Sequence, residues 1–265
     1  MKRSSIFLFT LLLMVVFSIP ASAAPNENDL IAPLEDAFSK NNQEVDQYLK
    51  MMGFTEDELA PLSTKLKKEI ASNGGIKIKV EQLDPEERII DKDGNDITNS
   101  RISIQDYNDS KFSLYGLAIK TASGTTENTY DIYAQYVWKS RPNFAFTDTL
   151  AMSWQSQVTP FGSPYSVHNW RNDPFTHQYT NSIQNQQNEG NSVLIDLLAV
   201  DSQQDGYIKQ TVKVSKSYQG TTGSVSLGYA HKIIPGIVST ILNYFSISFS
   251  GSGYQEFTDR FNFTY

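Results

Sequence analysis

The sequence predicts a mainly β protein: an antiparallel sandwich or barrel-like body that follows a small N-terminal α-helical segment. The hydrophobic period is the first observation. Apolar residues recur every three or four positions up to residue 72, and at every second position from Ile76 onward. The second observation is the regular spacing of the later segments, which are separated by turns rich in Gly, Asn and Ser. Short alternating strands between such turns favour antiparallel sheets over βαβ units.

The N-terminus has the pattern of a secretory signal peptide. Lys2 and Arg3 precede an apolar run from Ile6 to Ile19, and Ala21-Ser22-Ala23 supplies the small residues needed for cleavage. The run is shorter than the roughly 20 residues that span a bilayer as a helix. We expect residues 1–23 to be removed and the remaining chain to be secreted and extracellular, with association with the cell surface left open.

Residues 24–75 are expected to form the helical N-terminal segment. Leu30, Leu34 and Phe38 recur at helical spacing, and a second apolar stripe runs from Val45 to Met52. Thr55-Glu56-Asp57-Glu58 is a capping box, in which Thr55 and Glu58 cap a further helix. Pro61 is expected to divide that last helix. We expect the segment to pack on the β body, although a detachable pro-segment or an amphipathic membrane helix is also compatible with the pattern.

Residues 76–265 are expected to form the β-sandwich domain. Apolar and aromatic residues alternate in the strand candidates, which are 76–80, 112–120, 128–138, 147–154, 245–249 and 257–265. The strand 128–138 is apolar on both faces, which is typical of a sheet covered on both sides. Residues 207–234 are predicted to form a long hairpin, and the Pro-bearing stretch 155–191 a long polar loop.

Aromatic residues in the predicted strands also form a pattern known from other proteins. The pattern resembles a set of uncharacterised secreted Gram-positive β-rich proteins, and it spans roughly the last 140 residues of the chain. It comprises Tyr130, Tyr133 and Trp138, then Asp148, Leu150, Ala151, Met152 and Trp154, then Tyr229 and His231, and finally Phe261, Phe263 and Tyr265. The resemblance implies an exported, all-β protein and no particular activity.

Composition excludes several function classes. The chain has no cysteine, which rules out a disulfide scaffold, thiol catalysis and a Cys-built zinc site. A formal net charge of −7 disfavours nucleic acid as a partner. We also expect no cofactor and no metal. The stretch Asp91–Asp96 resembles the start of a calcium loop, but Gly94 stands at the fourth position and Ile102 at the twelfth, so a tight turn is favoured.

No pattern of residues indicates a reactive centre. A G-x-S-x-G nucleophile turn is absent, and the spacing of His168 and His177 matches no metal signature. We interpret these two histidines as surface loop residues and His231 as a strand-end residue. Asp131 and Asp148 lie within aromatic strands, and would be the only candidates if the protein were an enzyme. The sequence leaves enzymatic activity open and favours its absence.

A binding site is expected in the stretch 165–174. Trp170 stands there among His168, Asn169, Arg171 and Asp173. An indole ring supplies stacking area, and the polar neighbours can orient a sugar or a peptide, although a loop Trp can equally anchor its loop. Trp138 and Trp154 are interpreted as core residues.

The sequence therefore favours a non-enzymatic β-sandwich that binds a glycan or protein ligand at the cell envelope or in the extracellular matrix. A cell-wall glycan and a surface protein are the expected partners. The alternative is a secreted pore-forming or antimicrobial protein that inserts the 207–234 hairpin into a membrane, because the two predicted arms have one apolar face and one Ser/Thr face.

Overall fold

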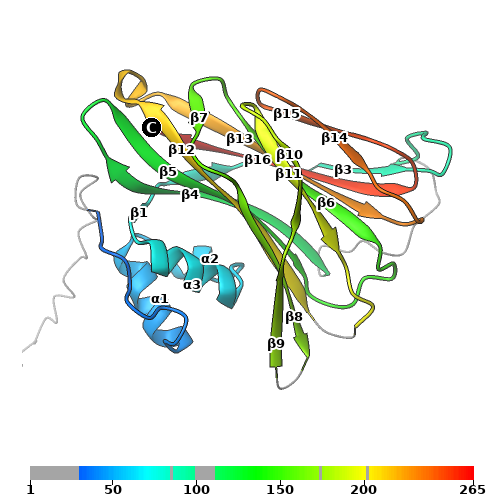
Figure 1. Ribbon diagram of the computed structural model, residues 1–265, viewed down its shortest axis with the longest axis horizontal. Coiled ribbons are helices and arrows are strands. Elements are labelled where there is room, and N and C mark those ends of the chain that lie inside the picture. The colour runs from blue at the N-terminus through cyan, green and yellow to red at the C-terminus, as the bar shows by residue number, and fades with distance from the viewer. Residues whose placement is uncertain (1–29, 84–85, 99–110, 173–174, 201–202) are drawn as a thin grey trace, which may run out of the picture.

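The computed structural model describes residues 30–83, 86–98, 111–172, 175–200 and 203–265, so the expected signal peptide at 1–23 lies outside the described residues. The fold is mainly β and antiparallel, and its sheets form a sandwich rather than a closed barrel (Figure 1). In the described chain, no helix has the length and apolar character needed to cross a membrane.

Sheet I has the strand order β1-β4-β5-β12-β8-β9, and β7 pairs with β12 beside that path. Its strands are β1 (Ile76–Lys77), β4 (Phe112–Ser123), β5 (Glu127–Trp138), β7 (Val158–Pro160), β8 (Tyr165–Asn172), β9 (Phe175–Thr180) and β12 (Gln204–Ser215). A short 3-10 helix, Lys216–Tyr218, follows β12.

Sheet II has the order β10-β11-β6-β13-β16-β2, with β3 also paired to β16. Its strands are β2 (Val80–Gln82), β3 (Glu86–Ile90), β6 (Thr147–Trp154), β10 (Ser182–Gln186), β11 (Gly190–Asp196), β13 (Thr222–Lys232) and β16 (Tyr254–Thr264). A separate hairpin of β14 (Ser239–Asn243) and β15 (Ser246–Ser250) forms its own two-stranded sheet.

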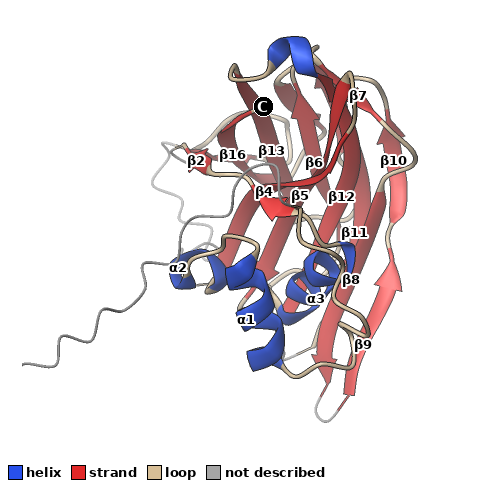
Figure 2. Cartoon of the chain, turned by 90° about the vertical axis from the view of Figure 1, so that its left-hand side faces the viewer, coloured by secondary structure: helices blue, strands red, loops and turns tan. Residues whose placement is uncertain are grey.

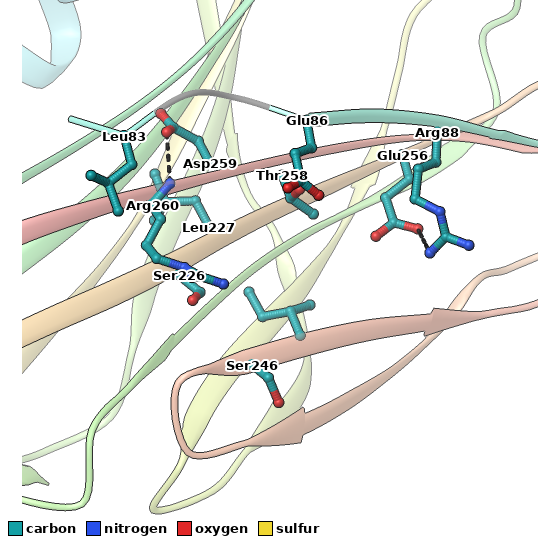
Figure 3. A pocket seen from close by; sticks show the side chains of 11 residues that line it. Leu83, Glu86, Arg88, Ser226, Leu227, Ser246, Glu256, Thr258, Asp259 and Arg260 are labelled. Atoms are coloured by element: carbon teal, nitrogen blue, oxygen red, sulfur yellow. Dashed lines mark hydrogen bonds and ion pairs between the residues drawn. The ribbon is translucent and has the colours of Figure 1, made fainter. Parts of the chain in front are cut away.

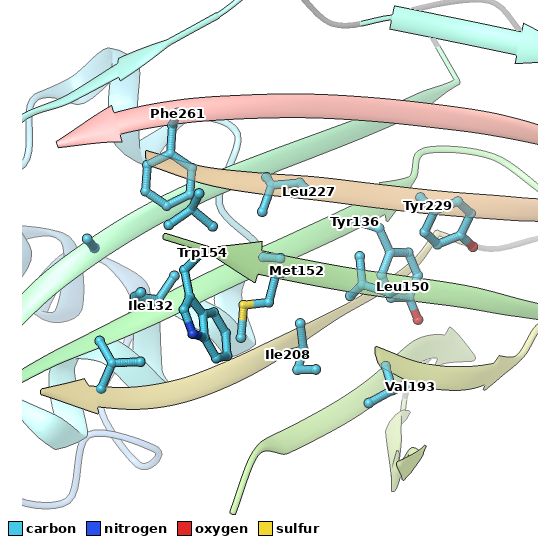
Figure 4. Packing of buried hydrophobic residues seen from close by; sticks show 14 of the residues in the cluster. Ile132, Tyr136, Leu150, Met152, Trp154, Val193, Ile208, Leu227, Tyr229 and Phe261 are labelled. Carbon is cyan, nitrogen blue, oxygen red and sulfur yellow. The ribbon is translucent and has the colours of Figure 1, made fainter. Parts of the chain in front are cut away.

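The main core lies between the two sheets. The alternating apolar residues predicted for the strands meet there, and Trp138 and Trp154 are 1% and 0% exposed, as expected for core residues. Figure 4 shows the packing of Ile132, Tyr136, Leu150, Met152, Trp154, Val193, Ile208, Leu227, Tyr229 and Phe261. Each fully buried apolar side chain of this size contributes roughly 1.5–3 kcal/mol, so this layer supplies much of the stability of the fold.

A second core lies on the other face of sheet I. The helices α1 (Asn42–Met51), α2 (Glu56–Leu59) and α3 (Thr64–Asn73) cover that face (Figure 2). Their apolar stripes pack on Leu117, Tyr133, Val167 and Tyr207 of sheet I. The strand β5 is therefore buried on both faces, as its two-sided apolar pattern predicted.

Local signals in the helical segment are confirmed in part. The capping box at Thr55 and Glu58 is present in both directions, and Pro61 separates α2 from α3. The helix expected from Leu30, Leu34 and Phe38 is absent from residues 30–40. Ile31 forms an isolated bridge with Gly75, residues 35–39 form turns, and Phe38 is 53% exposed. Asp36 adopts a positive φ of 53° within this stretch, and a left-handed residue of this kind interrupts a right-handed helix.

The turn predicted at Asp93-Gly94 is confirmed. Gly94 has a φ of 84°, and the Asp91 carboxylate accepts hydrogen bonds from the backbone N–H of Asp93 and Asn95 at 2.8 and 2.9 Å. The Asp91 carboxylate therefore holds the turn in place.

Two predictions about the long middle region are wrong. Residues 155–191 contain β7, β8, β9 and β10 rather than one loop. Residues 207–234 are not a hairpin, because β12 pairs with β5, β7 and β8 in sheet I while β13 pairs with β6 and β16 in sheet II. Their apolar faces do meet in the same core, because each points from its own sheet into the space between the sheets. The alternation therefore indicated the core residues correctly but not the strand pairing.

The helical segment is predicted to be an integral part of the folded structure. Leu66 of α3 is 0% exposed within the second core, so Leu66→Ala should lower the free energy of unfolding by about 2–5 kcal/mol, measured by urea denaturation. The matched control Lys65→Ala, on the partly exposed side of the same helix, should change it by less than about 0.5 kcal/mol. Equal effects of the two substitutions would contradict this assignment.

Candidate functional site

Residues 165–172 of the predicted binding stretch form β8, which lies between β12 and β9. In the register, Trp170 pairs with Gln204, the first residue of β12, so Trp170 stands where that neighbouring strand begins. The side chain of Arg171 and all of Asp173 lie outside the described part of the structure. The sequence suggested a loop here because prolines and polar residues dominate, yet polar residues are common on strands at a sheet margin.

His168 is buried, so its interpretation as a surface loop histidine is wrong. Its side chain is 0% exposed, its Nδ1 is hydrogen-bonded to the Tyr136 hydroxyl, and its Nε2 lies 3.1 Å from Oε1 of Gln204. Burial lowers the pKa of His168 to about 4, because the interior disfavours the charged ring. The ring is therefore neutral at physiological pH, and it joins β8 to β5 and β12.

Asn169 is also in the interior. It is 1% exposed, and its Nδ2 donates to Oδ1 of Asp205 on β12 at 3.1 Å. Since His168 and Asn169 are both enclosed, a ligand at the surface meets neither side chain directly. Their geometry suits them to holding β8 in place and thereby setting the position of Trp170.

Trp170 ends a series of rings that begins in the main core. Tyr136 packs on Tyr229 at a centroid distance of 5.2 Å and on His168 at 6.0 Å. His168 lies 6.0 Å from Trp170 and 4.9 Å from Tyr179, and the last two rings are 5.4 Å apart. Trp170 and Tyr179 are only partly buried, so the series brings aromatic surface to the exterior.

Further aromatic surface is linked to the same region. The Tyr179 hydroxyl donates to the backbone carbonyl of Asp196, and Asp196 lines a hollow of about 280 Å³ together with Phe146. Phe144 stacks on Phe146 at 6.3 Å and is 36% exposed. We name Trp170, Tyr179, Phe144 and Phe146 the aromatic end. The sequence analysis missed its last three members, although the Phe144-x-Phe146 alternation was a usable signal.

The carboxylate Asp148 is joined to a histidine inside the protein. Its Oδ2 lies 2.8 Å from Nδ1 of His231 and accepts a hydrogen bond from the Tyr229 hydroxyl at 2.6 Å, while Trp138 Nε1 donates to that hydroxyl at 2.9 Å. Both Asp148 and His231 are 0% exposed. A substrate has no access to side chains enclosed in this way. The network satisfies the Asp148 carboxylate and the Tyr229 hydroxyl, whereas Nε2 of His231 has no hydrogen-bond partner among the described residues.

The other in-strand carboxylate, Asp131, is also largely enclosed. It is 5% exposed, and its Oδ1 accepts a hydrogen bond from the Thr211 hydroxyl of β12 at 2.6 Å. This bond ties β5 to β12 within sheet I. Asp131 therefore has a structural partner of its own and lies apart from the histidines described above.

A charged hollow of about 400 Å³ lies on the outer side of sheet II, beside the β14–β15 hairpin (Figure 3). Arg88 pairs with Asp96 at 3.0 Å and approaches Glu256 at 3.9 Å. Asp259 accepts the backbone N–H of Arg260 at 2.6 Å, and burial raises its pKa to about 6. The Arg260 guanidinium lies 4.3 Å from the centre of the Phe245 ring at the hairpin turn.

Comparison with known proteins assigns the chain to no family. No protein-family model matches the sequence, and no curated protein matches it. Among solved structures, the collagen-binding subdomain of the Enterococcus faecalis surface protein ACE is 12% identical. It matches 57% of this chain and 95% of its own, with a TM-score of 0.32.

Two toxins from Clostridium perfringens are similar to the same degree. Delta-toxin is 8% identical over 71% of this chain and 93% of its own, with a TM-score of 0.32. The NetB toxin in its membrane-inserted form is 5% identical over 69% and 97%, with a TM-score of 0.29. The expected resemblance to Gram-positive β-rich proteins is confirmed in this coarse sense, and scores this low carry no argument about function.

The buried neutral state of His168 predicts a pH-dependent contribution to stability. Because its folded pKa lies below the unfolded value of 6.5, the contribution is complete above pH 6.5 and decreases as the pH falls toward 4. The stability difference between wild type and His168→Gln should therefore be larger at pH 7.5 than at pH 4.5, measured by urea denaturation. A difference that stays constant over this range would contradict the assignment.

The raised pKa of Asp259 predicts the opposite pH dependence of stability. Its folded pKa of about 6 exceeds the ordinary value of 3.8. The contribution of the protonated side chain to stability is therefore complete below about pH 4, and it is lost as the pH rises through 6. Asp259→Asn should raise the melting temperature at pH 8, and the gain should vanish near pH 4. The control Asp93→Asn, at an exposed turn, should give no such gain. A gain independent of pH would count against the burial argument.

Proposed function

We propose that this chain is an exported binding protein that acts at the cell envelope or in the extracellular matrix without catalysis, and that the aromatic end contacts its ligand. The ligand is a cell-wall glycan or a surface protein. The observation that carries the proposal is the ring series from Tyr229 to Trp170, which emerges from the core at partly exposed aromatic rings.

The physical basis is the rigidity and the area of these rings. Trp170 is packed on two neighbours, His168 and Tyr179, so a ligand that stacks on the indole needs to order little further structure. Phe144, which is 36% exposed and stacks on Phe146 of the hollow, adds apolar area. A flat ring with polar neighbours is a common arrangement for sugars and for extended peptides.

The enclosed positions of Asp148 and His231 favour binding over catalysis. Hydrolysis needs an acid or base within reach of a substrate, and both side chains are 0% exposed. The alternative function, membrane insertion of residues 207–234, would require β12 and β13 to leave two different sheets. That would expose the main core, so this route is less favourable than binding by the folded sandwich.

The test is retention of the protein on insoluble cell-wall glycan and on surface proteins immobilised in parallel. Trp170→Ala should weaken retention at least tenfold, and Trp170→Phe should restore part of it, because a smaller ring still stacks. Tyr218→Ala is the matched control. Tyr218 is 39% exposed in the helix that follows the far end of β12, so its loss should leave retention unchanged.

Fluorescence gives an independent readout for the same site. Trp138 and Trp154 are buried, so acrylamide should quench mainly Trp170, and a bound ligand should protect it. Failure of both materials to retain the wild-type protein, together with unchanged retention for Trp170→Ala, would overturn the proposal.

A further inference from the structure

The β14–β15 hairpin forms a third layer on the outer side of sheet II. Its strands pair with each other and belong to neither large sheet. Glycines with positive φ lie in the segments that connect it to β13 and β16, namely Gly236, Gly251 and Gly253. Such residues allow the backbone to rotate at the two joints with little steric penalty.

The inner side of the hairpin is apolar and rests on a glycine. Leu242 is buried, and Ile247 and Phe249 are partly buried against β13. A Cβ atom at Gly228 would lie 2.9 Å from the Phe249 ring and 3.1 Å from Cγ2 of Ile247, so the absence of a side chain there permits the contact. The hairpin thus covers the sheet through a small number of apolar side chains.

Individual hydrogen bonds attach the hairpin to the body. Gln184 Nε2 donates to the Val238 carbonyl at 2.9 Å, and Ser226 Oγ donates to the Phe245 carbonyl at 3.1 Å. At the turn, the Phe245 N–H donates to the Trp154 carbonyl at 2.9 Å. Each bond of this kind contributes only a small net free energy, because water can replace the partner. Release of the hairpin is therefore less costly than separation of the main sheets.

The segment that contains the hairpin is uncharged, and its length is comparable to that of two membrane-crossing strands. Residues 233–255, between Lys232 and Glu256, contain no charged residue. The turn residues Tyr244 and Phe245 divide them into arms of 11 and 10 residues. The second arm includes Tyr254 and Gln255, the first two residues of β16, whose pairing with β13 and β3 has to break when the arm leaves sheet II. A tilted β-strand needs about 9–11 residues to cross the hydrocarbon core of a bilayer.

The two faces of the hairpin also differ in polarity. Ser246, Ser248 and Ser250 point outward on β15 and alternate with Ile247 and Phe249, which point toward sheet II. On β14 the buried residues are Thr240 and Leu242. An apolar face and a hydroxyl-rich face suit lipid on one side and water on the other.

We propose that the β14–β15 hairpin leaves sheet II and inserts into a lipid bilayer, with the Ile247 and Phe249 side toward the lipid. Gly236, Gly251 and Gly253 allow the backbone to change from its present turns into two continuous strands, and Lys232 and Glu256 remain at the membrane boundary. Because an isolated hairpin would leave backbone groups unpaired in lipid, the inserted hairpins of several copies pair edge to edge. This assigns to residues 233–255 the role that the sequence analysis considered for 207–234, and it leaves the main core intact.

Exposed side chains of the hairpin supply the first contact with the bilayer. Ile237, Ile241 and Tyr244 are 59%, 53% and 48% exposed. Tyrosine is favoured at the membrane interface, where its ring lies among the headgroups. The absence of charge in this segment, in a chain of formal net charge −7, fits a zwitterionic surface better than an anionic one, which would repel the rest of the protein.

A disulfide that fixes the hairpin to sheet II tests the proposal. The position of Ile247 Cγ2 beside Gly228 places the two Cβ positions within reach of a disulfide, and the chain has no other cysteine. Phosphatidylcholine vesicles loaded with a self-quenching dye are the probe. Wild type and reduced Gly228→Cys/Ile247→Cys should release the dye, and oxidation of the double variant should slow release at least tenfold, reversibly by reductant.

Single cysteines carrying an environment-sensitive fluorophore test the orientation. A label at Phe249→Cys should shift to the blue and brighten with vesicles, whereas a label at the matched control Ser248→Cys should change little. Circular dichroism and the single variants Gly228→Cys and Ile247→Cys control for misfolding. Trp170→Ala should still release dye, since the vesicles contain neither glycan nor protein, so this result is separate from the proposed binding function.

Wild-type protein that releases no more dye than buffer would overturn the proposal. The same conclusion would follow if the oxidised double variant released dye as fast as the reduced one, or if the labels at 248 and 249 responded equally.

Discussion

Burial of sheet I on both faces is the constraint on which the rest of the structure depends. One face meets sheet II across the aromatic core, and the other meets the three helices. Within β5, Tyr136 and Tyr133 therefore point into two different cores. Since a strand enclosed in this way cannot slip by one residue without exchanging its faces, the two cores together determine the register of the sheet.

The same double burial explains the polar networks. Gln135 is 1% exposed, accepts the backbone N–H of Ser63 at 2.7 Å and donates to the Pro61 carbonyl at 2.9 Å. It thus satisfies the backbone where α2 gives way to α3. His168 serves a comparable need elsewhere in sheet I. Unpaired polar groups are costly inside a protein, so residues that look chemically interesting in the sequence are used here to hold strands in place.

Away from the two cores, the layers are attached more lightly. The aromatic end lies where Trp170 meets the beginning of β12, and the β14–β15 hairpin lies outside sheet II on a few side chains. These are the parts that can contact a ligand or a bilayer without loss of the main core. A rigid body that carries exchangeable outer elements is a common basis for recognition.

Much of the fold could be predicted from the sequence. Two-residue alternation determined the β class, the core positions of Trp138 and Trp154 and the two-sided burial of β5, because a pleated strand places successive side chains on opposite faces. The capping box at Thr55 and Glu58 is likewise a local property of a few neighbouring residues.

Only the tertiary structure decided which strands pair. Residues 207–234 have the alternation of a hairpin, yet β12 and β13 lie in opposite sheets. The apolar faces of two strands can be buried in one core either from the same sheet or from opposite sheets, so alternation does not distinguish the two arrangements. The candidate site depended on the same information: His168 looked like a surface residue until Tyr136 and Gln204, 32 and 36 positions away, enclosed it. Alternation records which face of a strand avoids water, but burial and partners depend on residues far away in the chain, which a single sequence does not place.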